Sequence, residues 1–392
     1  MARQLPLVLA VVIATTAVLA PATVATADGK TTVVQEAKAD AAAAHAAQLV
    51  SEMTTAEQAA SIVMGHISTH DPAALSTYMA GNGLGGFILM GGNVPGTEAD
   101  LQTATAALSS DPALPPLIAI DQEGGDVSRL PWDTFAASST LKDRPAAETA
   151  AAFAARASLV ARSGANVNFG IVADTTPDPS SFIYSRSLGA DPQGAAERVA
   201  AAVSAEEPFV ASTLKHFPGH GAAPGDSHQL IPSTGLTLDQ WHQADALPFI
   251  AGIDAGASLL MFGHLDYTAV DDAPASLSAR WHQIARDDLG FEGVIVTDDL
   301  GMLQSTGLPA YADPVANAVS AVVAGNDLVL TIAHSTPETA GQLAEGIAAA
   351  VGSGALPAER LQDAAERVMK LRLELAASSA VWAPCADCAP AS

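Results

Sequence analysis

The sequence predicts a single-domain α/β protein in which eight parallel strands alternate with helices and close into a (β/α)8 TIM-type barrel. Three observations predict this fold. Short apolar runs recur along the chain, most are continuously apolar as in strands buried on both faces, and helical segments separate most of them. The eight runs are Ser61–Ile67, Gly85–Met90, Leu117–Asp121, Val167–Ala173, Ala211–His216, Ser258–His264, Gly293–Thr297 and Asp327–Thr331.

Helical patterns fill most of the intervals between these runs. A closing helix follows Pro357, because apolar residues from Leu361 to Leu371 fall on one helical face and charged residues lie outside it. The other expected helices are Glu98–Leu108, Ala146–Ser163, Ala195–Ala205, Leu238–Ala255 and Pro314–Ala324.

The N-terminus has the layout of a secretory signal peptide, with Arg3, an apolar run and small residues before Ala27. We expect cleavage after Ala27 and a secreted or cell-wall associated protein. A retained anchor is the alternative, but the run is shorter than the roughly 18–20 residues that a spanning helix needs. The expected organisation is signal peptide 1–27, linker or first helix 28–47, catalytic barrel 48–376 and flexible tail 377–392.

Composition limits the partners. The 42 acidic residues exceed the 17 basic ones and give a formal charge of −25, which would repel nucleic acid. Cys385 and Cys388 in the tail are expected to form a local disulfide, with free thiols as the alternative. We expect a monomer without stable membrane insertion.

Charged side chains end several of the apolar runs. Asp121 ends the third, Asp174 follows the fourth, Lys215 and His216 end the fifth, His264 ends the sixth and Asp298 follows the seventh. Active residues of (β/α)8 barrels lie at the carboxyl ends of strands and in the loops after them. These positions are therefore the predicted site.

The seventh run ends in two adjacent carboxylates, Asp298 and Asp299. Successive side chains on a strand point in opposite directions, so one can face the site while the other turns away. A carboxylate nucleophile suits an acetal carbon, because it can stabilise an oxocarbenium ion and trap it as an ester. The pattern alone does not choose between the two.

The loop after the fifth run carries KHFPGHG at residues 215–221 and DSH at 226–228. Asp226 can orient the imidazole of His228 and favour its charged form, so the pair is predicted to be an acid/base dyad. A zinc site competes for these residues. We predict no metal, because Pro218 and Gly219 interrupt the helical spacing that His216 and His220 would need.

Five motifs together resemble glycoside hydrolase family 3, and most closely its bacterial β-N-acetylglucosaminidase branch. The resemblance spans about Leu49 to Leu373. It rests on the histidine loop with DSH, IDQEGG at 120–125, SRSLGADP at 185–192, PASLS at 274–278 and GVIVTDDL at 293–300.

The resemblance implies an exo-acting, retaining, cofactor-free enzyme that removes terminal N-acetylglucosamine from peptidoglycan fragments or chitin oligosaccharides through a glycosyl-enzyme intermediate. It implies that Asp298 is the nucleophile, His228 the acid/base and Asp226 its partner. The sugar-contacting positions implied are Asp121, Arg129, Arg186, Lys215 and His216. His264 and Asp174 are further pocket candidates because of their places at strand ends.

Two departures from the family pattern leave the preference beyond the terminal sugar open: Asp126 replaces a basic residue, and Ile171–Asp174 replaces Pro-Val-Leu-Asp. One alternative function is a β-N-acetylglucosaminide phosphorylase, since a deprotonated histidine would not repel phosphate. Another β-glycosidase of the family, such as a β-glucosidase, and a non-catalytic glycan-binding protein are the others.

Overall fold

The computed structural model describes residues 27–379. Apart from Ala27, the predicted signal peptide lies outside the described residues, as do Cys385, Cys388 and most of the predicted tail. The chain divides into two units, residues 1–41 and Ala42–Ser392, and the barrel belongs to the second.

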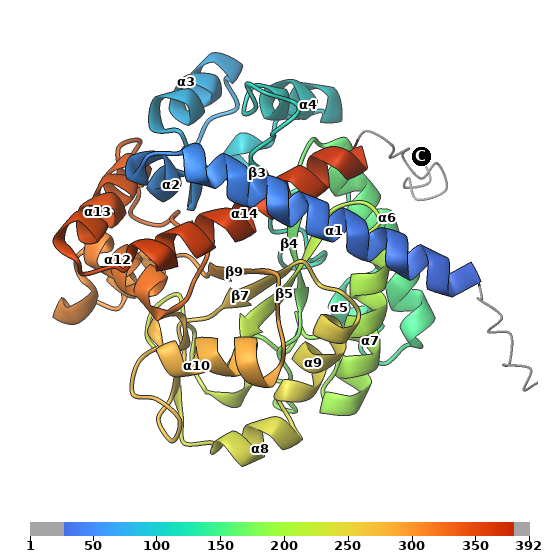
Figure 1. Ribbon diagram of the computed structural model, residues 1–392. Helices are drawn as coiled ribbons and strands as arrows, with labels where there is room; N and C mark the ends of the chain where they lie inside the picture. The colour runs from blue at the N-terminus through green and yellow to red at the C-terminus, as the bar shows by residue number, and fades with distance from the viewer. Residues whose placement is uncertain (1–26, 380–392) are drawn as a thin grey trace, which may run out of the picture. The chain divides into compact units, whose positions relative to one another are not determined.

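Eight parallel strands form one sheet in the order β10-β1-β2-β3-β4-β5-β7-β9. A further parallel bridge joins Val296 in β9 to Leu328, which lies directly before β10, and brings the two edges of the sheet together. The predicted barrel is therefore confirmed, and Figure 1 shows its strands in the middle of the surrounding helices. The strands are β1 (Val63–Gly65), β2 (Gly86–Leu89), β3 (Leu117–Ile120), β4 (Val167–Val172), β5 (Ala211–Phe217), β7 (Leu259–Phe262), β9 (Val294–Thr297) and β10 (Val329–Leu330).

Each barrel strand lies within one of the eight predicted runs or extends it by a single residue, and every residue in these strands is buried. Burial on both faces explains why the runs are continuously apolar. Two short strands, β6 (Ser233–Thr234) and β8 (Asp266–Tyr267), form a separate parallel sheet that the sequence did not predict.

Helices precede β1 and follow most of the strands. They are α1 (Ala27–Glu52), α2 (Thr55–Ser61), α3 (Pro72–Asn82), α4 (Glu98–Ala106), α5 (Ser138–Leu141), α6 (Ala146–Arg162), α7 (Pro192–Glu206), α8 (Leu238–Gln243), α9 (Ala246–Asp254), α10 (Ala279–Gln283), α11 (Gly301–Ser305), α12 (Pro314–Ala324), α13 (Thr339–Ser353) and α14 (Ala358–Ser379).

An Asp-Pro pair begins three of these helices. In α3, α7 and α12 the aspartates Asp71, Asp191 and Asp313 are N-caps whose carboxylates accept backbone N–H bonds, and proline follows as the first helical residue. The cap satisfies a free N–H donor and proline is preset for the first helical position, so each pair fixes a helix start.

The prediction of one helix over Leu238–Ala255 was wrong. The structure has two helices, α8 and α9, separated at Ala244, whose φ is −134° and ψ is −82°. Pro248 explains the break, because it has no N–H to donate to the Ala244 carbonyl and its ring would clash with that carbonyl in a continuous helix.

Helix α14 packs at the amino ends of the strands. The guanidinium of Arg372 donates to the carbonyls of Leu114 and Pro115, close before β3, and Arg367 donates to the Glu292 carbonyl before β9. The carboxyl ends of the strands are thus at the opposite end from α14. Within residues 27–379, no helix is long and apolar enough to cross a membrane.

Candidate active site

The barrel gathers most of the predicted site residues at the carboxyl ends of its strands. Asp121 and Asp174 come shortly after β3 and β4, while Lys215 and His216 lie near the carboxyl end of β5. His264 follows β7, and Asp298 directly follows β9. Because the strands are all parallel, these ends surround one mouth of the barrel.

Lys215 and Arg129 form ion pairs with Asp121. The Lys215 Nζ lies 3.1 Å from Asp121 Oδ1, and the Arg129 Nη2 lies 3.1 Å from Asp121 Oδ2. Asp121 and Arg129 retain side-chain exposures of 16% and 28%. Both can therefore offer hydrogen bonds to a ligand at the barrel mouth.

Glu123 is a site residue that the reasoning from strand ends missed. Arg186 donates to both of its oxygens, at 2.9 and 2.7 Å, and the Lys215 Nζ lies 2.7 Å from Oε1. Burial raises the pKa of Glu123, but the charges of Lys215 and Arg186 outweigh it and lower the pKa to about 2. Its position two residues after Asp121, in the IDQEGG motif, was the signal that could have identified it.

These contacts also determine the state of Lys215. Burial lowers the pKa of this side chain, but the charges of Glu123 and Asp121 outweigh burial and raise the pKa above its ordinary value. Lys215 therefore stays a cation although it is only 3% exposed. Glu123 fixes Lys215 and Arg186 relative to each other.

Asp174 is buried and orients His216. Its Oδ2 lies 2.7 Å from Nδ1 of His216, and its Oδ1 accepts the backbone N–H groups of His216 and His220 at 3.1 and 2.6 Å. Burial raises the pKa of Asp174, yet the charge and hydrogen bond of His216 outweigh it and lower the pKa. Asp174 thus holds the sugar-contact candidate His216 rather than facing a ligand itself.

Asp298 and Asp299 have different surroundings. The Asp299 carboxylate accepts backbone N–H bonds from Gly301, Ile332 and Ala333 at 2.8–2.9 Å, and burial raises its pKa to about 6. Burial also raises the pKa of Asp298, but His216 and His264 outweigh burial and bring it below its ordinary value. Asp298 is therefore the ionised carboxylate beside the site histidines, and Asp299 holds the backbone.

The predicted dyad lies in the loop after β5. The Nδ1 of His228 is 2.6 Å from Oδ1 of Asp226, and the His228 backbone N–H donates to the same oxygen at 3.0 Å. Burial raises the pKa of Asp226, but these hydrogen bonds outweigh it and lower the pKa. The His228 side chain is 60% exposed, so its imidazole is accessible from solvent.

The pKa of His264 responds to the charges of both candidate catalytic groups. Burial lowers its pKa most, the charge of Asp298 raises it, and the charge of His228 lowers it. Both ring nitrogens are occupied, with Nδ1 2.7 Å from the Ser276 hydroxyl and Nε2 2.9 Å from the Asp299 carbonyl. Since Nε2 faces a carbonyl it must donate, and Ser276, within the PASLS motif, donates to Nδ1.

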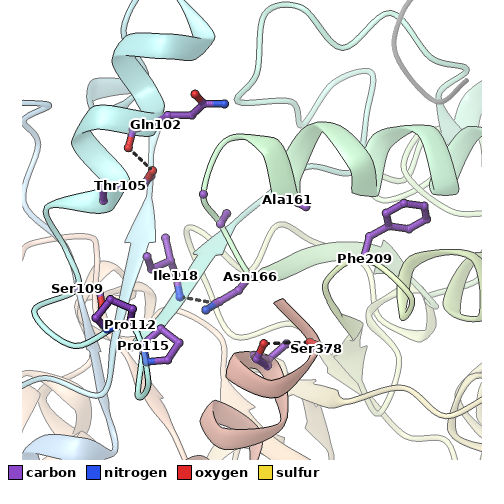
Figure 2. Close-up of a pocket in the computed structure, with 14 residues that line it drawn as sticks. Gln102, Thr105, Ser109, Pro112, Pro115, Ile118, Ala161, Asn166, Phe209 and Ser378 are labelled. Carbon is purple, nitrogen blue, oxygen red and sulfur yellow. Dashed lines mark hydrogen bonds between the residues drawn. The ribbon is translucent and has the colours of Figure 1, made fainter. Parts of the chain in front are cut away.

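Two cavities lie at the opposite end of the barrel from these residues. Cavities of about 780 and 420 Å³ lie at the amino ends of the strands, the first near the starts of β1 and β2 and the second near those of β3 and β4. Figure 2 shows the smaller cavity, where Ile118 and Asn166 are joined by a hydrogen bond near Ser378 of α14. Within the described part of the chain, no group of three or more metal-ligating side chains is arranged to hold a metal ion.

Comparison with known proteins decides the family, because residues 46–371 match the glycosyl hydrolase family 3 N-terminal domain. The chain belongs to glycosyl hydrolase family 3. The predicted membership and the prediction of a glycoside hydrolase are therefore confirmed.

Family 3 relatives of this chain include a β-hexosaminidase of Xanthomonas oryzae pv. oryzae, 34% identical over 281 residues that cover 69% of this chain and 82% of the relative. A β-hexosaminidase of Pseudomonas aeruginosa is 35% identical over 255 residues, or 63% of this chain and 74% of the relative. The resemblance to this branch of the family is thus confirmed as well.

Solved family 3 structures agree with the barrel. A β-N-acetylglucosaminidase from Paenibacillus sp. superposes with a TM-score of 0.77 at 29% identity; the match covers 84% of this chain but only 64% of the Paenibacillus chain. A β-N-acetylhexosaminidase from Beutenbergia cavernae gives a TM-score of 0.71 at 26% identity, covering 82% of this chain and 99% of that one.

Proposed function

We propose that this family 3 enzyme is an exo-acting, retaining β-N-acetylglucosaminidase that removes terminal N-acetylglucosamine from peptidoglycan fragments or chitin oligosaccharides. The names of the relatives, β-hexosaminidase and β-N-acetylglucosaminidase, support the sugar specificity. The N-terminal sequence supports action outside the cytoplasm, in the medium or at the cell wall.

One observation carries the proposal. Ring contacts of His228 with Phe182, of Phe182 with His220 and of His220 with His216 connect the loop histidine to the strand ends where Asp298 lies, which supports the action of both groups on one sugar. Retaining hydrolysis needs these two groups at one sugar, a nucleophile beside the anomeric carbon and a proton donor beside the leaving oxygen.

The first chemical step would be attack by Asp298 on the anomeric carbon. The pKa of this carboxyl is low despite burial, because His216 and His264 stabilise its charge, so it is ionised when the sugar binds. The Asp299 N–H donates to Oδ1 of Asp298 at 2.8 Å and leaves Oδ2 to form the ester.

Protonation of the leaving oxygen would come from His228. With Nδ1 bound to Asp226, the proton for the leaving group would be on Nε2, and the same nitrogen would then deprotonate the water that hydrolyses the ester. Asp226 stabilises the imidazolium and fixes the ring. The charged groups of Asp121, Arg129, Arg186 and Lys215 would bind the hydroxyls of the sugar.

An assay with aryl β-N-acetylglucosaminide and aryl β-glucoside tests the reaction. We expect wild-type enzyme to release the aryl group from the first substrate in preference to the second, and Asp298→Ala and His228→Ala to lose most turnover. Turnover that survives in the double variant would contradict the proposal. Adding inorganic phosphate should neither accelerate the reaction nor yield sugar 1-phosphate; if it does both, the enzyme is a phosphorylase.

Natural substrates are tested by digesting purified muropeptides and chitobiose in parallel, with products identified by mass spectrometry. Release of N-acetylglucosamine from either one supports the proposed substrate class. Intact muropeptides and chitobiose, together with cleavage of another β-glycoside, would contradict it.

A further inference from the structure

The rings of His216, His220, Phe182 and His228 form a row of edge-to-face contacts. The centroids of His216 and His220 are 6.0 Å apart, those of His220 and Phe182 4.6 Å, and those of Phe182 and His228 6.2 Å, with interplanar angles of 74–84°. The row runs from the sugar-contact candidate in β5 to the exposed imidazole of the dyad.

Phe182 packs against a buried residue, His220. His220 beneath it is 1% exposed, and the backbone N–H of His220 is held by the buried Asp174. On another side, the guanidinium carbon of Arg186 lies 5.8 Å from the Phe182 centroid, and Arg186 is fixed by its two bonds to Glu123. The ring therefore has a defined place relative to the sugar-binding charges.

The dyad needs a contact of this kind. Asp226 is only two residues from His228 in the same loop, so their hydrogen bond orients the imidazole but does not tie the loop to the barrel. Phe182 belongs to the loop after β4 and thus joins two different loops. An edge-to-face pair adds a small but real preference for one arrangement.

We propose that Phe182 is a positioning residue for the acid/base His228, holding its imidazole beside the leaving-group oxygen through the edge-to-face contact of the two rings. The inference rests on the proposed function, since it assumes that His228 protonates the leaving group. It concerns how the proton donor reaches the sugar, and assigns Phe182 no contact with the reacting atoms.

The dependence of rate on the leaving group separates this role from a structural one. A 2,4-dinitrophenyl N-acetylglucosaminide departs without protonation, whereas chitobiose needs a proton from the enzyme. Phe182→Ala should lower kcat/KM for chitobiose about 3- to 10-fold, the range of one aromatic pair, and leave the dinitrophenyl substrate within about 2-fold. Phe182→Tyr, which keeps the ring, should restore the chitobiose rate.

Three further variants make the test decisive. In a His228→Ala background, Phe182→Ala should have no additional effect on chitobiose, because the group it positions is gone. Ile183→Ala, at a fully buried side chain of the same loop, is the matched control and should lower thermal stability and affect both substrates equally. Phe182→Leu keeps apolar volume if the alanine variant folds poorly, and should show the same selective loss.

Equal losses on both substrates in the Phe182 variants, or a further loss of chitobiose activity in the His228→Ala background, would overturn the role of Phe182. A wild-type enzyme that cleaved neither N-acetylglucosaminide would instead overturn the proposed function, so the two failures are distinguishable.

Discussion

The backbone N–H of Asp299 donates a 2.8 Å hydrogen bond to Oδ1 of Asp298, while the carboxylate of Asp299 itself faces different partners. The Asp299 carboxylate accepts backbone N–H bonds from nearby Gly301 and from Ile332 and Ala333 in another loop, whereas Asp298 interacts with the site histidines. The difference assigns separate roles to two residues that the sequence pattern could not distinguish.

This assignment predicts that substitution changes stability little at Asp298 and strongly at Asp299. Asp298→Asn should keep its stability within about 1 kcal/mol of wild type, because the amide oxygen can still accept the Asp299 N–H. Asp299→Ala leaves three buried backbone donors unpaired and should lose at least about 2 kcal/mol of unfolding free energy. Urea unfolding checks stability, and the aryl assay at low temperature checks activity. A stable Asp299→Ala or a destabilised Asp298→Asn would contradict the division of roles.

His228→Ala should slow chitobiose hydrolysis by about 10²- to 10⁴-fold, the usual contribution of general acid catalysis. Glycosylation by the dinitrophenyl substrate, measured as kcat/KM, should fall far less because its leaving group needs no proton. Asp226→Asn removes the charge but keeps a hydrogen-bonding group, so its loss should be smaller than that of His228→Ala. Equal losses of kcat/KM on both substrates would show that His228 does not act as the acid.

Glu123→Gln should lower kcat/KM by about 10- to 100-fold, because hydrogen bonds to charged groups contribute about 1.5–3 kcal/mol and two cations would lose their shared anion. Steady-state kinetics with the aryl substrate measures this. Glu148→Gln is the matched control: its side chain is 54% exposed and lies 4.0 Å from Arg144, so its removal should change nothing measurable. A Glu123→Gln enzyme as active as this control would contradict the role of Glu123.

Glu206 should make stability depend on pH. It is fully buried, its Oε1 accepts a 2.6 Å bond from Asn168, and burial raises its pKa from 4.5 to about 8. The folded state therefore binds more protons than the unfolded state between these values, and stability from this group is lost as pH rises through that interval.

Glu206→Gln cannot ionise, so its unfolding free energy should fall less than that of wild type between pH 5 and pH 9. Chemical denaturation at pH 5, 7 and 9 measures the difference, with Glu345→Gln on the exposed side of α13 as the control. Parallel stability curves for wild type and Glu206→Gln would show that Glu206 is not protonated in the folded enzyme.

The barrel could be predicted because its strands are buried on both faces and leave continuous apolar runs, as in Val294–Thr297. Helices α3 and α13 were not expected, although Asp71 and Pro72 mark the start of α3 in the sequence. The strand-end rule predicted Asp121, Lys215 and Asp298 as site residues, and the structure places all three at the carboxyl ends of strands. It missed Glu123 and Phe182, because their roles depend on contacts with residues far away in the chain, although the IDQEGG motif contains Glu123.

Azide rescue of Asp298→Ala tests the central claim most directly, that Asp298 attacks a sugar whose leaving oxygen is protonated by His228. With an activated aryl β-N-acetylglucosaminide, azide should restore turnover to Asp298→Ala and yield the α-glycosyl azide, because the anion attacks from the face that the carboxylate occupied. Azide with His228→Ala should instead yield the β-azide, since it attacks the intact glycosyl-enzyme. Undiminished turnover by Asp298→Ala without azide, or the β-azide from that variant, would contradict the account.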